Sequence, residues 1–162
     1  MLRYILIAAL AAIYILFGTP SYLLEQSWAS ALSYPFFHAN LVHLIVNCIA
    51  LWLLFDPKRK GNFRQMLFGL AVSLLVYPCA LHAPVGFSNA LYAVIGLRTP
   101  SFSSPWWKKP EVIIFLVVTF AMLLLPQLSG FTHILSMAIG IAVAALGRFI
   151  RKINNDAKES LR

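Results

Sequence analysis

Ser88 and His133 are two side chains of this 162-residue sequence whose types and positions suit bond-breaking chemistry. Each opens an apolar segment, where a polar group is costly and is a functional candidate by default. A serine beside a histidine is the nucleophile and base pair of acyl transfer. No Asp or Glu lies in the core of an apolar segment, so we expect a dyad rather than a triad with an acid.

A second polar group consists of His38, His43 and Asn47 in another apolar segment. His43 and Asn47 are four residues apart and therefore share one face of a helix. Both side chains could donate hydrogen bonds to an oxyanion, as could the first backbone N–H groups of the helix that carries Ser88. Ordinary interpretations also exist, because a serine at a helix start is often a cap and a membrane asparagine often bonds a neighbouring helix.

The expected depth of these residues favours the catalytic interpretation. Ser88 lies ten residues from Arg98, which corresponds to about 15 Å of helix. The same rise per residue puts His43 about 20 Å from Asp56 and His133 about 22 Å from Arg148, the charged residues at the inner ends of their segments. In a hydrocarbon core about 30 Å thick, all three fall in one layer, about 8–15 Å below the outer face. The ordinary interpretations do not explain this common layer.

Small residues predict how two of the helices meet. Ser88, Tyr92 and Gly96 follow one another at intervals of four residues, and His133 and Gly140 share a stripe of their own segment. Glycines allow close approach of helices in a membrane. A contact at Gly96 and Gly140 would bring His133 beside Ser88.

The composition predicts the elements that hold these residues. Hydrophobic residues make up 60% of the chain, charged residues 11%, and the mean hydropathy is +0.80. Soluble and disordered classes are excluded, because a chain this short cannot bury so much apolar surface. We expect an all-α membrane protein, since only helices and closed barrels satisfy their backbone in lipid. Six spans are predicted over residues 4–18, 35–55, 66–81, 85–97, 112–125 and 131–150, followed by a short polar tail over 151–162.

The fourth span is too short to cross the membrane, so the loop before it must dip inward. Irregular backbone at that depth requires a shielded or water-filled cavity. The prediction is a pit open to the outside, with Ser88 at its floor.

Basic residues define the expected orientation. With six spans, all 13 Lys and Arg residues lie on one side, which puts both termini in the cytoplasm. The net charge of +8 then reflects topology and contact with anionic lipid rather than nucleic-acid binding. Cysteines and histidines show no metal-ligand spacing, and no metal, cofactor or disulfide is expected.

Together these residues resemble the rhomboid family of intramembrane serine proteases. The motifs that carry the resemblance are H-x4-H-x3-N at His38, His43 and Asn47, a GxSG-like segment with its following tyrosine at Gly86, Ser88 and Tyr92, and the sixth-span pair His133 and Gly140.

The resemblance implies a six-span rhomboid-like bundle with a short central fourth helix, in a bacterial inner membrane. It implies cleavage of the transmembrane segments of other membrane proteins, with Ser88 as nucleophile and His133 as general base and with no cofactor. The further implied roles are an oxyanion hole of His43, Asn47 and the Ser88 N–H, ring packing of Tyr92 on His133, a tight loop at Gly86, close helix approach at Gly96 and Gly140, and a supporting position for His38.

Three features depart from the family pattern. Asn89 follows the serine where the family has glycine, Ser136 replaces another glycine, and Trp28 in the first loop is not followed by arginine. A catalytically weak or inactive rhomboid-like protein that binds membrane clients therefore remains an alternative. A transporter or haem-binding bundle is a third possibility, although haem would need histidines matched across two facing helices. The substrate and the oligomeric state are left open by the sequence.

Substrate entry is expected beside the fifth span. Residues 112–125 contain no ionisable group, and residues 126–130 form a loop that could act as a hinge. We expect this span and loop to move as a gate next to the second span.

Overall fold

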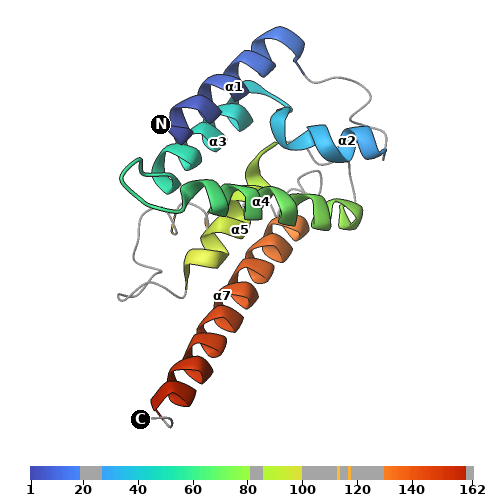
Figure 1. The fold of residues 1–162 in the computed structure, drawn as a ribbon. Coiled ribbons are helices and arrows are strands. Elements are labelled where there is room, and N and C mark those ends of the chain that lie inside the picture. Colours follow the sequence, from blue (N-terminus) through green and yellow to red (C-terminus); the bar gives the residue numbers. More distant parts are fainter. Residues whose placement is uncertain (19–26, 81–85, 100–112, 114–116, 118–129, 160–162) are drawn as a thin grey trace.

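A computed structural model describes residues 1–18, 27–80, 86–99, 113, 117 and 130–159 of the chain. All regular secondary structure in this part is helical, as the sequence predicts. The elements, in chain order, are α1 (Leu2–Phe17), α2 (Trp28–Ser33), the 3-10 turn η2 (Tyr34–Phe36), α3 (Leu41–Leu54), α4 (Asn62–Val76), the 3-10 turn η3 (Tyr77–Cys79), α5 (Ser88–Arg98) and α7 (Gly130–Glu159) (Figure 1).

Helix α5 is the centre of the fold. All of its residues except Leu97 are buried. It packs chiefly against α7 and α4 and also touches α3 and η2, while α1 and α3 lie side by side (Figure 1). A helix that is buried all round needs no polar face, which is why its sequence has almost no amphipathic pattern.

Glycines bring α5 close to both of its main neighbours. A Cβ at Gly69 of α4 would lie 2.6 Å from the carbonyl oxygen of Ala90. A Cβ at Gly96 or at Gly140 would collide with the backbone of the facing helix. The sequence predicted a close approach of two helices at Gly96 and Gly140, and α5 and α7 do meet there. This approach depends on the absence of side chains at the two positions.

The second predicted span is broken rather than continuous. Its helix α3 begins at Leu41, because the Asn40 side chain caps it by accepting a hydrogen bond of 2.9 Å from the His43 N–H. The preceding helical segment, Trp28–Phe36, meets α3 at an angle of 70°. His38 lies in this break, which corrects the expectation of one continuous helix that carries both His38 and His43.

The C-terminal end of α5 is tied to two other helices. Arg98 is buried and its guanidinium donates hydrogen bonds to the carbonyl of Leu54 and to the side chains of Gln65 and Asn62. It also lies 5.4 Å from the Phe55 ring centroid. The sequence predicted a charge in a cytoplasmic loop, but the structure buries it where it joins the ends of α3, α4 and α5.

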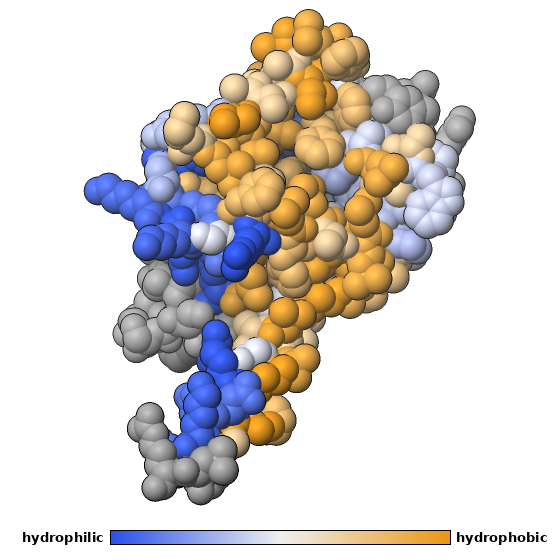
Figure 2. Space-filling model, in the orientation of Figure 1, coloured by the Kyte–Doolittle hydropathy of each residue, from blue (hydrophilic) through white to orange (hydrophobic). Residues whose placement is uncertain are grey.

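The surface of the helices is strongly apolar. Figure 2 shows hydrophobic residues over most of the visible body and hydrophilic residues gathered on one side and along the end of α7. Large exposed apolar side chains occur on α1, α3, α4 and α7, for example Ile15, Val42, Leu75 and Phe149. Exposed apolar patches of this extent mark a surface that contacts something other than water.

Among the described helices, α7 is long and apolar enough to cross a membrane, and the bent pair Trp28–Phe36 with Leu41–Leu54 can be counted as a second span. Helix α1, with 16 residues, is apolar but shorter. Helix α7 continues to Glu159, so most of the predicted polar tail is helical. The predicted fifth span and its loop lie outside the described residues, apart from positions 113 and 117, and the count of six spans stays a prediction.

Candidate active site

Ser88 is the first residue of α5 and faces His133 of α7. Its Oγ lies 2.6 Å from His133 Nε2, and both side chains are buried. Phe87 occupies the N-cap position, and no side chain caps the helix. The Ser88 hydroxyl is thus bonded to the imidazole rather than to the helix start, which rules out the ordinary interpretation of this serine as a cap.

His133 is held in place by its ring as well as by its hydrogen bond. Tyr92 lies one turn after Ser88 and stacks on the imidazole, with ring centroids 4.7 Å apart and planes inclined by 21°. His133 Nδ1 is buried and has no hydrogen-bond partner in the described part of the chain. If Nε2 accepts the proton of Ser88, the neutral ring must carry its own proton on Nδ1. The tyrosine ring therefore orients the imidazole where a triad would use a carboxylate.

His43 and Asn47 converge on the loop just before Ser88. A Cβ built at Gly86 would lie 2.7 Å from His43 Nε2 and 3.3 Å from Asn47 Nδ2. The backbone at Gly86 has φ +104°, a conformation that side chains disfavour, so glycine is required for space and for conformation.

Both groups have donor capacity to spare. His43 Nε2 is buried and has no partner among the described residues. Asn47 Nδ2 donates to the His43 carbonyl at 3.1 Å, and an amide nitrogen carries a second hydrogen. The first backbone N–H groups of α5 also lack acceptors within their own helix. This combination of donors suits an anionic oxygen beside Ser88.

His38 supports His43 from the break before α3. Its side chain is fully buried, and the two imidazole rings meet edge to face with centroids 5.3 Å apart. The structure thus brings Ser88, His133 and Tyr92 together in one cluster. It places His43 and Asn47 against Gly86, two residues before the serine, with His38 next to His43. His82 lies outside the described residues.

Two of the three departures from the family pattern, Asn89 and Ser136, lie in buried positions that accommodate them. Ser136 is buried on α7, and its hydroxyl donates a 2.7 Å hydrogen bond to the carbonyl of Thr132. Asn89 is buried at the start of α5, and its Nδ2 donates to the Tyr34 hydroxyl at 3.3 Å. Tyr34 was not predicted as a site residue, because no local spacing relates it to a residue 55 positions away.

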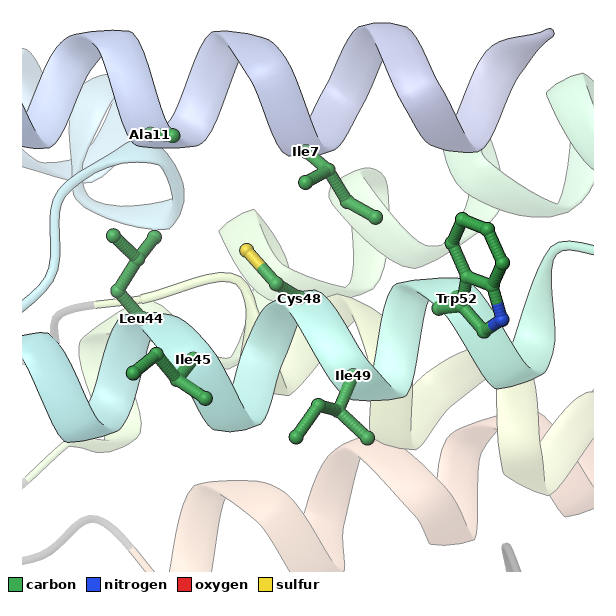
Figure 3. Close-up of a pocket in the computed structure, with 7 residues that line it drawn as sticks. All are labelled: Ile7, Ala11, Leu44, Ile45, Cys48, Ile49 and Trp52. Atoms are coloured by element: carbon green, nitrogen blue, oxygen red, sulfur yellow. The ribbon is translucent and has the colours of Figure 1, made fainter.

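An apolar groove of about 430 Å³ lies elsewhere, between α1 and α3 (Figure 3). Its lining consists of Ile7, Ala11, Leu44, Ile45, Cys48, Ile49 and Trp52. None of these side chains is an acid, a base or an activated nucleophile. None of them is a candidate site residue either, so the groove is not part of the candidate site. In the part of the chain that the structure describes, no cluster of His, Cys, Asp or Glu could hold a metal ion.

Comparison with known families adds to this geometry. The family model of the rhomboid domain matches residues 25–148. The chain belongs to the rhomboid family. The matched range contains every candidate residue on α3, α5 and α7, so the resemblance read from the motifs is confirmed. A rhomboid domain implies a membrane protein, and the family includes serine proteases. No match was found among curated proteins.

Proposed function

We propose that this rhomboid protein is an intramembrane serine protease that cleaves transmembrane segments of other membrane proteins by a dyad of Ser88 and His133. The observation that carries the proposal is the buried 2.6 Å hydrogen bond between Ser88 Oγ and His133 Nε2 in a rhomboid domain. A nucleophile within hydrogen-bond reach of its base is the signature of covalent catalysis by serine.

In the first half-reaction, Ser88 Oγ attacks the carbonyl carbon of the scissile peptide bond while His133 Nε2 takes the hydroxyl proton. The carbonyl oxygen becomes an oxyanion in the tetrahedral intermediate. The C–N bond then breaks, and His133 returns the proton to the leaving amine. The product is an acyl-enzyme ester on Ser88 and a released amine fragment.

In the second half-reaction, water attacks the ester carbonyl and gives its proton to His133. The ester C–O bond breaks, the proton returns to Ser88 Oγ, and a carboxyl fragment leaves. Because no acid assists His133 among the described residues, the base depends on Tyr92 stacking and on burial for its orientation.

His43 Nε2, Asn47 Nδ2 and the Ser88 N–H would stabilise the oxyanion. The convergence of the His43 and Asn47 side chains beside Gly86, two residues before Ser88, supports this role. Donors fixed in a water-poor site are worth far more than donors in water, because they need no reorganisation when the charge develops.

The proposal includes a six-span topology with cytoplasmic termini in a bacterial inner membrane, and transmembrane proteins and lipid as partners. The one-sided distribution of the 13 basic residues supports the orientation. The exposed apolar side chains of α1, α3, α4 and α7 support contact with lipid.

The experiment compares the wild type with Ser88→Ala and with Ser136→Ala as the matched control, each reconstituted in vesicles. A fluorophosphonate probe should label the wild type and the control on Ser88 and should not label Ser88→Ala. A reporter fused to a transmembrane segment should be cleaved by the wild type and by Ser136→Ala, and it should not be cleaved by Ser88→Ala.

A folded wild type that neither reacts with the probe nor cleaves the reporter would overturn the proposal. That result would favour a rhomboid-like protein that binds membrane clients without cleaving them. Cleavage by a folded Ser88→Ala protein would show that another residue is the nucleophile.

A further inference from the structure

Tyr34 contacts the chain on both sides of Ser88. Its backbone carbonyl accepts a hydrogen bond of 2.9 Å from the N–H of Gly86, two residues before the serine. Its hydroxyl accepts a hydrogen bond of 3.3 Å from Nδ2 of Asn89, the next residue after the serine. One fully buried residue from η2 thus holds the segment 86–89 at its two ends.

Tyr34 is itself anchored to the neighbouring helix. Its hydroxyl donates a 2.8 Å hydrogen bond to the backbone carbonyl of Ser73 in α4. Its ring lies against Tyr77, with centroids 5.2 Å apart, and the Tyr77 hydroxyl is hydrogen-bonded to Ser30 Oγ at 2.6 Å. Because the Tyr34 hydroxyl donates to a fixed carbonyl, its lone pairs point in a fixed direction. The hydroxyl can therefore hold the Asn89 amide, from which it accepts a hydrogen bond, in one position.

Asn89 makes this contact specific to the present chain. The side chain is buried, and its Oδ1 has no partner in the described residues, so the bond from Nδ2 to Tyr34 is the contact that holds the amide. A buried amide that loses its partner is strongly disfavoured. The amide and the hydroxyl are therefore expected to act as one unit.

We propose that Tyr34 is a positioning residue that acts through Asn89 and Gly86. It keeps Ser88 Oγ within hydrogen-bond distance of His133 Nε2 and keeps the Ser88 N–H directed toward the oxyanion. This inference rests on the proposed function. Displacements of about 1 Å at a reacting group cost about 10²-fold in rate, so a small relaxation of segment 86–89 should be measurable.

The test is Tyr34→Phe, which removes the hydroxyl and keeps the ring and the backbone carbonyl. We expect kcat for a transmembrane reporter to fall by about 10-fold or more, with KM little changed, because the substrate contacts are intact. The rate of fluorophosphonate labelling of Ser88 should fall by a similar factor.

Tyr77→Phe is the matched control. It removes a buried hydroxyl from the same cluster, together with its bond to Ser30, and among the described residues this hydroxyl has no hydrogen bond to segment 86–89. We expect its melting temperature to fall as in Tyr34→Phe while kcat stays near the wild-type value. If kcat falls equally in both variants, the role is merely structural and the inference is wrong.

Asn89→Ala and the double variant test the link itself. If the hydroxyl acts through the amide, Tyr34→Phe and Asn89→Ala should each lower kcat by a similar factor, and the double variant should be no slower than either one. Losses that multiply in the double variant would overturn the coupling.

The two proposals fail in different ways. An active wild type whose Tyr34→Phe variant keeps full kcat contradicts the positioning role and leaves the protease intact. A folded wild type without labelling or cleavage contradicts both.

Discussion

Gly86 lies directly against the imidazole of His43, so that a Cβ at position 86 would be 2.5 Å from His43 Cε1 and 2.7 Å from Nε2. The contact joins the loop before the nucleophile to the helix that carries the candidate oxyanion donors. The backbone of Gly86 is also left-handed, with φ +104°. Any side chain at this position would therefore strain the loop and displace a donor.

Gly86→Ala should reduce labelling of Ser88 by about 10²-fold or more, because the added methyl group must move His43 or the loop. The left-handed conformation adds a cost in stability of about 1–3 kcal/mol. Labelling rate and melting temperature are both measured.

Gly61→Ala is the control that separates backbone strain from the contact with His43 in Gly86→Ala. Gly61 also has a left-handed backbone, with φ +84°, but a Cβ there would meet nothing within 4 Å. We expect a comparable loss of stability and a normal labelling rate. Equal loss of labelling in the two variants would show that backbone strain alone explains the effect.

His133→Ala should lower cleavage by about 10²–10⁴-fold, the usual contribution of a general base. His82→Ala should remain near the wild-type rate, because the sequence puts His82 in a loop six residues before Ser88. Cleavage rates of the two variants at equal protein concentration provide the check. The opposite ranking would mean that the base was assigned wrongly.

Asn47→Ala should reduce kcat by about 10²–10³-fold and leave KM almost unchanged. The amide would interact with a charge that exists only in the tetrahedral intermediate, so its loss should not affect ground-state binding. A full dependence of rate on substrate concentration distinguishes the two parameters. An effect confined to KM would point to substrate contact instead.

Gly140→Ala should destabilise the protein and slow cleavage, since the methyl group would collide with the α5 backbone and separate Ser88 from His133. Overpacking of this kind costs about 1–3 kcal/mol. Thermal unfolding and cleavage are followed together.

Gly147→Ala on the same helix is the control for Gly140→Ala. A Cβ there would meet nothing within 4 Å, so the variant should be neutral or more stable by about 0.5–1 kcal/mol, as alanine favours a helix. A Gly140→Ala protein as stable and active as Gly147→Ala would argue against a tight α5–α7 contact.

Local spacing was sufficient for the features that depend on one helix or on composition. The membrane class follows from the 60% hydrophobic content, and the common face of His43 and Asn47 follows from their spacing of four residues. The approach of Ser88 to His133 could be predicted because Gly96 and Gly140 mark where two helices can touch.

Other features required the packed structure. The position of His38 depends on a break that Asn40 creates by capping α3, and a span predicted from hydropathy alone runs through such a break. The burial of Arg98 depends on acceptors that two separate helices, α3 and α4, supply.

The sequence by itself determined which residues could react, because residue type is a local property. It also predicts roughly how deep they lie, because helical rise and apolar length are local properties too. The stacking of Tyr92 on His133, which the family resemblance had implied, is confirmed. Only the tertiary structure decided the other contacts around them: Gly86 against His43, and Tyr34 on Asn89. These contacts join residues from different segments of the chain. They arise from the packing of several side chains at once, and no spacing along one segment encodes that packing.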